Sequence, residues 1–264
     1  MATYTPPRRE FLMQPSIYDA GRDSLGGYFV SELLSGVRVF WDGGLSRGKR
    51  TTNIPYANAF RPDSCEVRSG LLPVATGLWS EDGSPVAAPD WFLNMLPCMP
   101  LDGILCAGPD QGIFCRKLVS DKGTDDRWQS ISFAVFGSPP INQVFRDGRL
   151  TTSSTKFEIN YSDTTRWMHS LDESIIADYY FFDTSRDGLT FEKELALLRG
   201  LVPPDGPIHL ANHKKLPPRV SEATKVATGL FDTVVKNGGK GLIYRQPEGE
   251  WAPLRTRSYL KEAA

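Results

Sequence analysis

Cysteine and histidine are the residue types in this sequence that could hold a metal ion or supply a nucleophile. The four cysteines are Cys65, Cys98, Cys106 and Cys115, and the three histidines are His169, His209 and His213. No two cysteines form a C-x-x-C pair, and the histidines lie far from them along the chain. Zinc ligands normally come in such short spacings. The sequence therefore predicts no metal and no cofactor, and four reduced thiols in a protein made in the cytoplasm.

Basic residues could bind phosphate, and they are frequent near the C-terminus. They are Lys214, Lys215, Arg219, Lys225, Lys236, Lys240, Arg245, Arg255, Arg257 and Lys261. The formal net charge is −1 and the pI is about 6.3, which disfavours nucleic-acid binding as the main task of the chain. Two interpretations stay open, a nucleic-acid-binding face and a set of solvated surface charges.

Several strands are expected to position these residues. The segment 27–40, GYFVSELLSGVRVF, predicts a strand, a tight turn at Ser35-Gly36 and a second strand. ISFAVFGSPP, residues 131–140, predicts a buried strand that is stopped by its prolines, and GLIYR, residues 241–245, predicts another. Between residues 91 and 115 the prolines and glycines permit only short elements.

Two helices are predicted in the second half of the chain. Thr190 can cap FEKELALLRG, in which apolar residues share one face and Gly200 ends the helix. Ser221 can cap EATKVATGLFDTVVKN, which Gly238-Gly239 ends. Strands and helices alternate without a regular βαβ order, so the expected class is α+β. No internal repeat is evident, and we expect an N-terminal arm, residues 1–25, and one domain, residues 26–264.

Five sequence blocks, taken together with their order along the chain, indicate a resemblance to a known family. They are SELLSGVRVF with Leu33 to Arg38, LDGILCAG from Leu101, AVFGSPP with Phe136 and Gly137, GGKGLIYR from Gly238, and a final LKEA from Leu260. The chain resembles the adenylation domain of ATP-dependent DNA ligases, particularly the compact ligases of bacteriophages, over roughly residues 30–261. The resemblance implies an ATP-grasp-like nucleotidyltransferase domain of antiparallel sheets flanked by helices. The sequence ends after the last block, so no oligonucleotide-binding (OB) domain is expected.

The resemblance also shows which chemical groups differ. The family pattern K-x-D-G-x-R reads here Leu33-Leu34-Ser35-Gly36-Val37-Arg38, so the lysine that would attack the α-phosphate of ATP is a leucine. The carboxylate of that motif is Ser35, and the glutamate that would bind the ribose is Ile104. Lys240 stands where a glutamate would help to hold a metal, and Ala263 replaces the second lysine of L-K-x-K. We therefore expect no catalytic residue, no metal and no enzyme activity.

Some family positions are retained. The resemblance implies that Arg38 could contact a ribose, Phe136 could stack on adenine and Lys261 could meet a phosphate. The alternatives are a surface salt bridge for Arg38, a core position for Phe136 and a solvated Lys261. Gly36, like Gly103 and Gly108, is expected to serve the backbone whether or not a nucleotide binds.

The sequence thus favours a catalytically inactive, ligase-like protein that serves as a structural or adaptor component, with a phage particle and its head-tail or tail apparatus as the expected assembly. Its partners would be other protein subunits. The alternatives are a nucleic-acid-binding module that keeps the ligase groove and, third, an active ATP-dependent ligase. Synthesis in the host cytoplasm and a place in the virion follow, and no run of about 18 apolar residues predicts a membrane span. Candidate contact residues are Pro6, Pro7, Arg8, Arg9, Trp79, Trp91 and Trp251, and for each tryptophan the alternative is a place in the core.

Overall fold

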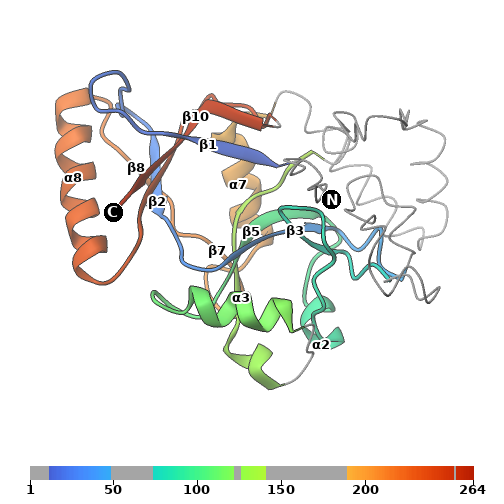
Figure 1. The fold of residues 1–264 in the computed structure, drawn as a ribbon. Helices are drawn as coiled ribbons and strands as arrows, with labels where there is room; N and C mark the ends of the chain where they lie inside the picture. The colour runs from blue at the N-terminus through green and yellow to red at the C-terminus, as the bar shows by residue number, and fades with distance from the viewer. Residues whose placement is uncertain (1–11, 49–73, 122–125, 141–188, 253) are drawn as a thin grey trace, which may run out of the picture.

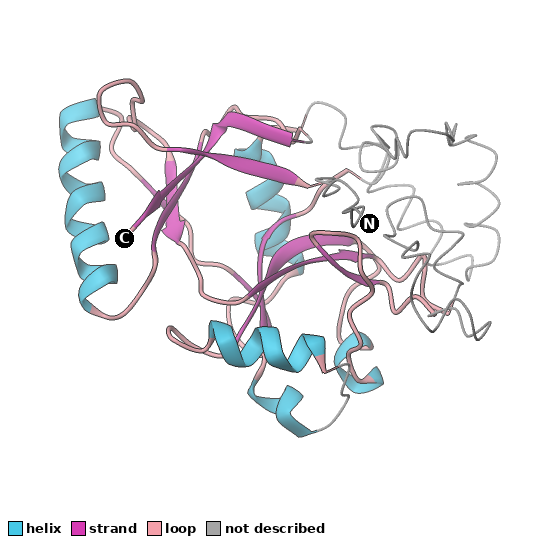
Figure 2. Cartoon of the chain, in the orientation of Figure 1, coloured by secondary structure: helices cyan, strands magenta, loops and turns pink. Residues whose placement is uncertain are grey.

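Two twisted sheets with helices on their outer sides form the part of the protein that the structure describes (Figures 1 and 2). The structure is a computed structural model, and it describes residues 12–48, 74–121, 126–140, 189–252 and 254–264. Both sheets are mostly antiparallel, and the helices do not alternate regularly with strands. The expected α+β class is confirmed.

The first sheet has the strand order β1-β10-β9-β2-β8. Its strands are β1 (Met13–Ile17), β10 (Leu254–Ala263), β9 (Gly241–Arg245), β2 (Phe29–Glu32) and β8 (Lys214–Lys215). β1 runs parallel to β10, while the other neighbours are antiparallel. The long helix α8 (Val220–Lys236) covers the outer face of this sheet, at the left of Figure 1.

The second sheet has the strand order β4-β3-β5-β6-β7. Its strands are β4 (Leu78–Ser80), β3 (Val37–Asp42), β5 (Pro100–Cys106), β6 (Ser132–Gly137) and β7 (Ile208–Leu210). Only the pair β6 and β7 is parallel within this described sheet. The helices α2 (Asp90–Leu93) and α3 (Gly112–Ser120) and the 3₁₀ helix η2 (Asp126–Ser130) supply Phe92, Leu118 and Trp128 to the main apolar core under it.

The period-two alternation of strand side chains separates the two faces of the first sheet. Along β9, Leu242 and Tyr244 belong to the apolar cluster beneath α8. Ile243 and Arg245 point to the opposite side and line a pocket between the sheets. On β10, Leu260 likewise joins the α8 cluster, while its two neighbours face the pocket. The inner face of this sheet is therefore the more polar one.

The same alternation operates in the second sheet. Leu101 and Leu105 of β5 pack into the main core, whereas Ile104 lines the pocket. On β6, Val135 lies in the core and Phe136 lines the pocket. Because alternate residues of each strand are buried in a core, the residues between them point to the space between the sheets. The alternation of apolar residues in the sequence therefore determines which side chains line the pocket.

Helix α7 (Phe191–Leu201) contacts both sheets. Leu198 packs into the main core of the second sheet. Phe191 and Leu195 pack against Phe29 of β2 in the first sheet, and the Phe29 and Phe191 ring centroids lie 5.6 Å apart in an edge-to-face arrangement. The aliphatic and aromatic face of one helix therefore joins the two halves of the molecule.

Both predicted helices are confirmed, with differences at their ends. Thr190 occupies the N-cap position of α7, although its side chain makes no capping hydrogen bond. The second helix begins earlier than predicted: Arg219 is the N-cap, and Ser221 lies inside the first turn. Gly238 follows its C-terminus with φ = +82°, the left-handed conformation expected of a glycine that ends a helix.

The two strands predicted within residues 27–40 are confirmed, and they do not pair with each other. β2 and β3 do form, yet they belong to different sheets, so residues 33–36 cross from one sheet to the other instead of closing a hairpin. Residues 13–17, which the sequence placed in the N-terminal arm, form β1 of the first sheet. Residues 1–11, with the candidate contact residues Pro6, Pro7, Arg8 and Arg9, lie outside the described residues.

Two of the three candidate contact tryptophans are buried, so that prediction was wrong for them. Trp79 is fully buried and its Nε1 donates to Asp42 Oδ2 at 3.1 Å and to Ser46 Oγ at 3.2 Å, because a buried indole N–H needs an acceptor. Trp251 is also buried. Trp91, on α2, is 43% exposed. No described helix is long and apolar enough to cross a bilayer.

Candidate functional site

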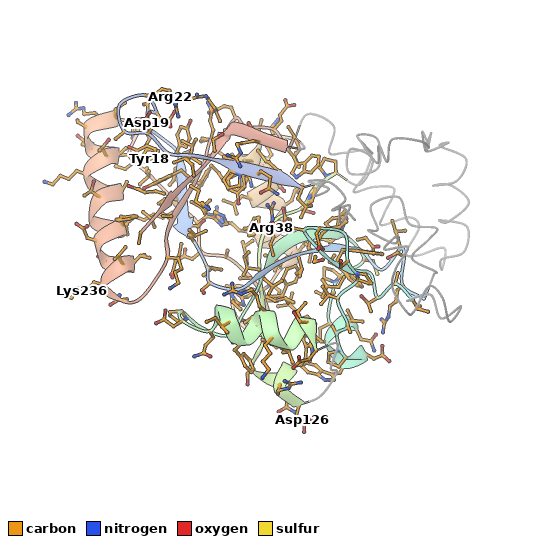
Figure 3. All side chains as sticks on the ribbon, viewed as in Figure 1. Tyr18, Asp19, Arg22, Arg38, Asp126 and Lys236 are labelled. Atoms are coloured by element: carbon orange, nitrogen blue, oxygen red, sulfur yellow. The ribbon has the colours of Figure 1, made fainter. Side chains whose placement is uncertain are left out.

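A pocket of about 190 Å³ lies between the inner faces of the two sheets. The strands β1, β2, β9 and β10 of the first sheet and β3, β5 and β6 of the second contribute to its wall. Arg38, labelled in Figure 3, lies in this central region, while Lys236 lies far away at the end of α8. All five sequence blocks border the pocket or its immediate surroundings, so they are close in space as well as ordered in sequence.

The pocket brings together five of the predicted site residues. They are Leu33, Arg38, Ile104, Phe136 and Lys261. Leu33, which the sequence resemblance aligns with the ligase lysine, follows β2 directly and forms part of the wall. It carries no nucleophile.

The remaining three predicted positions do not line the pocket. Ser35 packs against α3, where a Cβ added to Gly112 would lie 2.5 Å from Ser35 Oγ. Lys240 lies in the turn before β9 and donates from Nζ to Asp110 Oδ1 at 3.3 Å. These two side chains are 54% and 71% exposed, so the ion pair is a surface contact between loops of the two halves. Ala263 is an exposed residue at the end of β10.

Arg38 forms a buried ion pair with Asp102 of β5. Its Nε donates to Asp102 Oδ1 at 3.0 Å and its Nη2 to Asp102 Oδ2 at 2.7 Å. Nη2 also donates to the carbonyl oxygen of Met13 at 2.8 Å. The Arg38 and Asp102 side chains are only 10% and 4% exposed. Burial lowers the pKa of Arg38, but the charge and the hydrogen bonds of Asp102, with smaller contributions from Tyr259 and Glu81, together raise it above its ordinary value. Arg38 thus links β3 and β5 of the second sheet to β1 of the first.

Arg245, at the end of β9, is the second buried arginine of the site. Its guanidinium Cζ lies 4.1 Å from the ring centroid of Phe191 and 4.9 Å from that of Tyr259, so two aromatic rings hold it. Its Nη2 lies 3.8 Å from Glu194 Oε2, which is ion-pair distance but too long for a hydrogen bond. Within the described residues this Nη2 has no hydrogen-bond partner.

His213 is a buried, neutral histidine on the same wall. Burial lowers its pKa to about 4, a neighbouring positive charge on Arg245 acts in the same direction, and the bond to Ala211 only partly opposes them. Nδ1 lies 2.7 Å from the Ala211 carbonyl oxygen. Because that oxygen can only accept, Nδ1 carries the proton and donates, and Nε2 is left as an acceptor.

The depressed pKa of His213 predicts an acid-sensitive fold. Between pH 6.5 and 4 the unfolded chain takes up a proton at this residue that the folded chain does not. The contribution of His213 to the free energy of unfolding is therefore fully present above pH 6.5 and is lost as the pH falls toward 4. The loss attributable to His213 is roughly 3 kcal/mol. Urea unfolding at several pH values should therefore show a flatter profile for His213→Gln than for the parent protein. Parallel profiles would contradict the assignment.

Five of the ten C-terminal basic residues are buried or paired with a carboxylate in the described structure. Arg245 is buried. Lys215 and Arg219 pair with Glu192 and Glu222, and Lys240 and Arg257 pair with Asp110 and Asp23. Those four carboxylates neutralise part of the positive charge that the frequent basic residues near the C-terminus would carry. Lys261 lines the pocket instead of projecting into bulk solvent.

Several residues of the wall escaped the sequence prediction. Glu32 and Glu81 border the pocket, and Tyr259 flanks Arg245. Arg245 had a usable signal, because it closes the GGKGLIYR block. His213 had none, since a lone histidine before a short strand is uninformative by spacing. Glu81 follows β4, and its approach to the pocket depends on the tertiary structure.

The thiols and histidines form no metal site in the described ranges, where no group of three or more potential ligands was found. Among the described cysteines, Cys106 and Cys115 are buried free thiols, and Cys98 is exposed. Burial raises the pKa of the Cys115 thiol, which keeps it protonated and unreactive at neutral pH. Cys65 lies outside the described residues.

The two mostly antiparallel sheets and the pocket between them can be compared with known folds. Solved structures show a likeness. A Lig E DNA ligase, from a study of DNA binding with a minimal scaffold, is similar with a TM-score of 0.58 and 16% identity, covering 96% of this chain and 68% of that one. The ATP-dependent DNA ligase of bacteriophage T7, in complex with ATP, is similar with a TM-score of 0.54 and 10% identity, covering 97% and 69%. No family model and no curated protein matches the sequence. The chain therefore has the fold of an ATP-dependent DNA ligase adenylation domain.

Proposed function

We propose that this protein is a catalytically inactive member of the ligase fold that serves as a structural or adaptor component of a larger assembly, with a phage particle as that assembly. The observation that carries the proposal is Leu33 on the wall of the pocket, at the position of the family's nucleophile. A hydrocarbon side chain cannot form a covalent bond to AMP. Among the described residues that line the pocket, Lys261 is the sole lysine.

The surroundings of Leu33 support the same proposal. Ile104 offers no hydrogen-bond acceptor to a ribose, and Lys240 stands outside the pocket in an ion pair with Asp110. A divalent metal needs oxygen ligands, which a lysine does not provide. Arg38 is held by Asp102 and the Met13 carbonyl, so it has a structural role that does not require a nucleotide.

The proposal predicts that the protein forms no covalent adenylate. After incubation with labelled ATP and Mg²⁺, denaturing electrophoresis should show no labelled band. Leu33→Lys should remain unlabelled too, because Ile104 and Lys240 still lack the ribose and metal contacts that position ATP. Label on the parent protein that Lys261→Met removes would identify Lys261 as a replacement nucleophile and would overturn the proposal.

The structural role has its own test. Purified phage particles from the host should contain this chain in a fixed ratio to other particle proteins, measured by quantitative mass spectrometry. Trp91, 43% exposed on α2, and Met95, equally exposed just after it, form an apolar surface for a protein contact. Trp91→Ala should lower incorporation without lowering stability. Particles that lack the chain would refute the role.

A nucleic-acid-binding module is the alternative, and the ion pairs of Lys215, Arg219, Lys240 and Arg257 weigh against it. A gel shift with nicked duplex DNA distinguishes the two. Affinity that falls steeply with salt would support the alternative, because it would reveal several phosphate contacts. Weak binding with little salt dependence would support the structural proposal.

A further inference from the structure

One row of side chains crosses the inner face of the first sheet and forms part of the pocket wall. Antiparallel pairing places Ile243 of β9 between Ser31 of β2 and Lys261 of β10. On the other side of β2, the register with β8, continued by one residue, brings His213 beside Ser31. All four side chains line the pocket. Side chains directly opposite each other in a sheet have Cβ atoms about 5 Å apart, so Ser31 and His213 can bind the same ligand atom.

Ser31 and His213 each present a polar atom that has no hydrogen-bond partner within the described residues, although both residues are only 9% exposed. The Nδ1–H of His213 donates to the Ala211 carbonyl oxygen, and the imidazole packs on the ring of Phe191 with the centroids 5.5 Å apart. These two contacts fix the imidazole and leave Nε2 as an acceptor. The Ser31 hydroxyl can donate one hydrogen bond and accept others. Buried polar atoms normally have a partner, so the pair indicates a place for a bound group.

The charges of the wall favour an uncharged ligand at this place. Both arginines of the wall are already paired with buried carboxylates. Of the other charged residues that line the pocket, Lys261 is positive, whereas Glu32 and Glu81 are negative, so one negative charge remains. That balance disfavours an anion. A cation bound at Ser31 would meet Lys261, which lies two strands away in the same row. A neutral ligand avoids both repulsions and loses less hydration on burial.

The rest of the wall is apolar and limits the ligand in size. Ile104 of β5 and Phe136 of β6 line the pocket from the second sheet, and Leu33 lines it from the crossing between the sheets. Hydrocarbon surface of this kind favours an apolar group over water. A protein cavity of about 150 Å³ is sufficient for benzene, so the volume of about 190 Å³ suits one ring with a small polar group.

We propose that this pocket binds a small uncharged molecule of one ring that carries a hydroxyl group. The ligand hydroxyl donates to His213 Nε2 and accepts from Ser31 Oγ, so one group satisfies both side chains. The ring packs on Leu33, Ile104 and Phe136. A carboxylate or carbonyl oxygen cannot replace the hydroxyl, because it has no hydrogen to donate to Nε2. The inference goes beyond the structural or adaptor role and does not depend on it.

The test uses phenol as the probe on the full chain at neutral pH, where a phenolic hydroxyl is uncharged. A saturation-transfer NMR titration should give a Kd of about 1 mM or tighter. Anisole keeps the ring and the oxygen but has no hydrogen to donate, and benzoate and benzylammonium are charged. Each of these three should bind at least about tenfold more weakly than phenol. Equal binding of phenol and anisole, or no binding of phenol, would overturn the proposal. Tighter binding of adenosine than of phenol would also overturn it, because the pocket would then be a nucleoside site.

Variants assign the binding to this pair of side chains. Ser31→Ala removes the donor and should weaken phenol binding about fivefold, the effect of one hydrogen bond. His213→Phe removes the acceptor and should weaken phenol binding about tenfold, to the level of anisole. Ser221→Ala is the matched control, because Ser221 is an exposed serine of α8, and it should bind phenol as the parent does. Circular dichroism establishes that each variant is folded before binding is measured. If Ser31→Ala binds phenol as tightly as Ser221→Ala does, the hydroxyl is held elsewhere and the proposal fails.

Discussion

Asp102→Ala is expected to destabilise the folded protein by about 3–5 kcal/mol. The substitution leaves the charge of Arg38 buried without its counter-ion, since the side chain is only 10% exposed and cannot reach water easily. The remaining acceptor, the Met13 carbonyl, neutralises no charge. Urea unfolding followed by circular dichroism measures the difference, and the midpoint should fall without a change in slope.

Two further variants separate the ion pair from general damage to β5. Asp102→Asn keeps the size and one acceptor, so it should destabilise the protein less than Asp102→Ala. Asp110→Ala removes the partner of Lys240 in an ion pair that is exposed on both sides, and it should cost less than about 1 kcal/mol. Equal losses for Asp102→Ala and Asp110→Ala would show that Arg38 finds another partner or reaches solvent.

Much of the fold could be predicted from local patterns, because the patterns reflect burial. The helices predicted over residues 191–200 and 222–237 match α7 and α8 to within two residues at each end, and GLIYR matches β9. Local sequence could not show that β2 and β3 join different sheets. Their lengths and the Ser35-Gly36 turn suit a hairpin, and only the partners β9 and β5, distant in sequence, decide the pairing.

The candidate site was predictable to the extent that it lies in the five blocks. Leu33, Ile104 and Phe136 lie in three of the blocks that occur in the order of the ligase motifs, and the structure places all three at the same pocket. The resemblance gave Lys240 only as a lost position of the metal-holding glutamate, and its ion pair with Asp110 at the surface could not be read from the motif. His213 and Glu81 reach the pocket through tertiary packing, which leaves no trace in their neighbours along the chain.

Gly36→Ala is expected to destabilise the protein by about 3 kcal/mol, the upper end of the usual cost of overpacking. A Cβ at this position would lie far inside van der Waals contact with the carbonyl oxygen of Leu105 and 2.6 Å from Ile104 Cγ2. Leu105 cannot withdraw, because β5 is paired on both sides, with Val37 of β3 and Phe133 of β6. The φ of Gly36 is not in the left-handed region, so close packing is the reason that only glycine fits.

The result would explain why a glycine stands at position 36 while Leu33 stands three residues before it, since the crossing between the sheets needs the glycine whether or not the pocket carries out chemistry. Gly200→Ala is the matched control. Gly200 lies inside α7, nothing lies within 4 Å of an added Cβ, and alanine favours the helix, so this variant should be stabilised by about 0.5–1 kcal/mol. Chemical unfolding compares the two variants directly. If Gly36→Ala were as stable as the parent, the crossing would have to be wider than the structure indicates, and the retention of Gly36 would need a ligand to explain it.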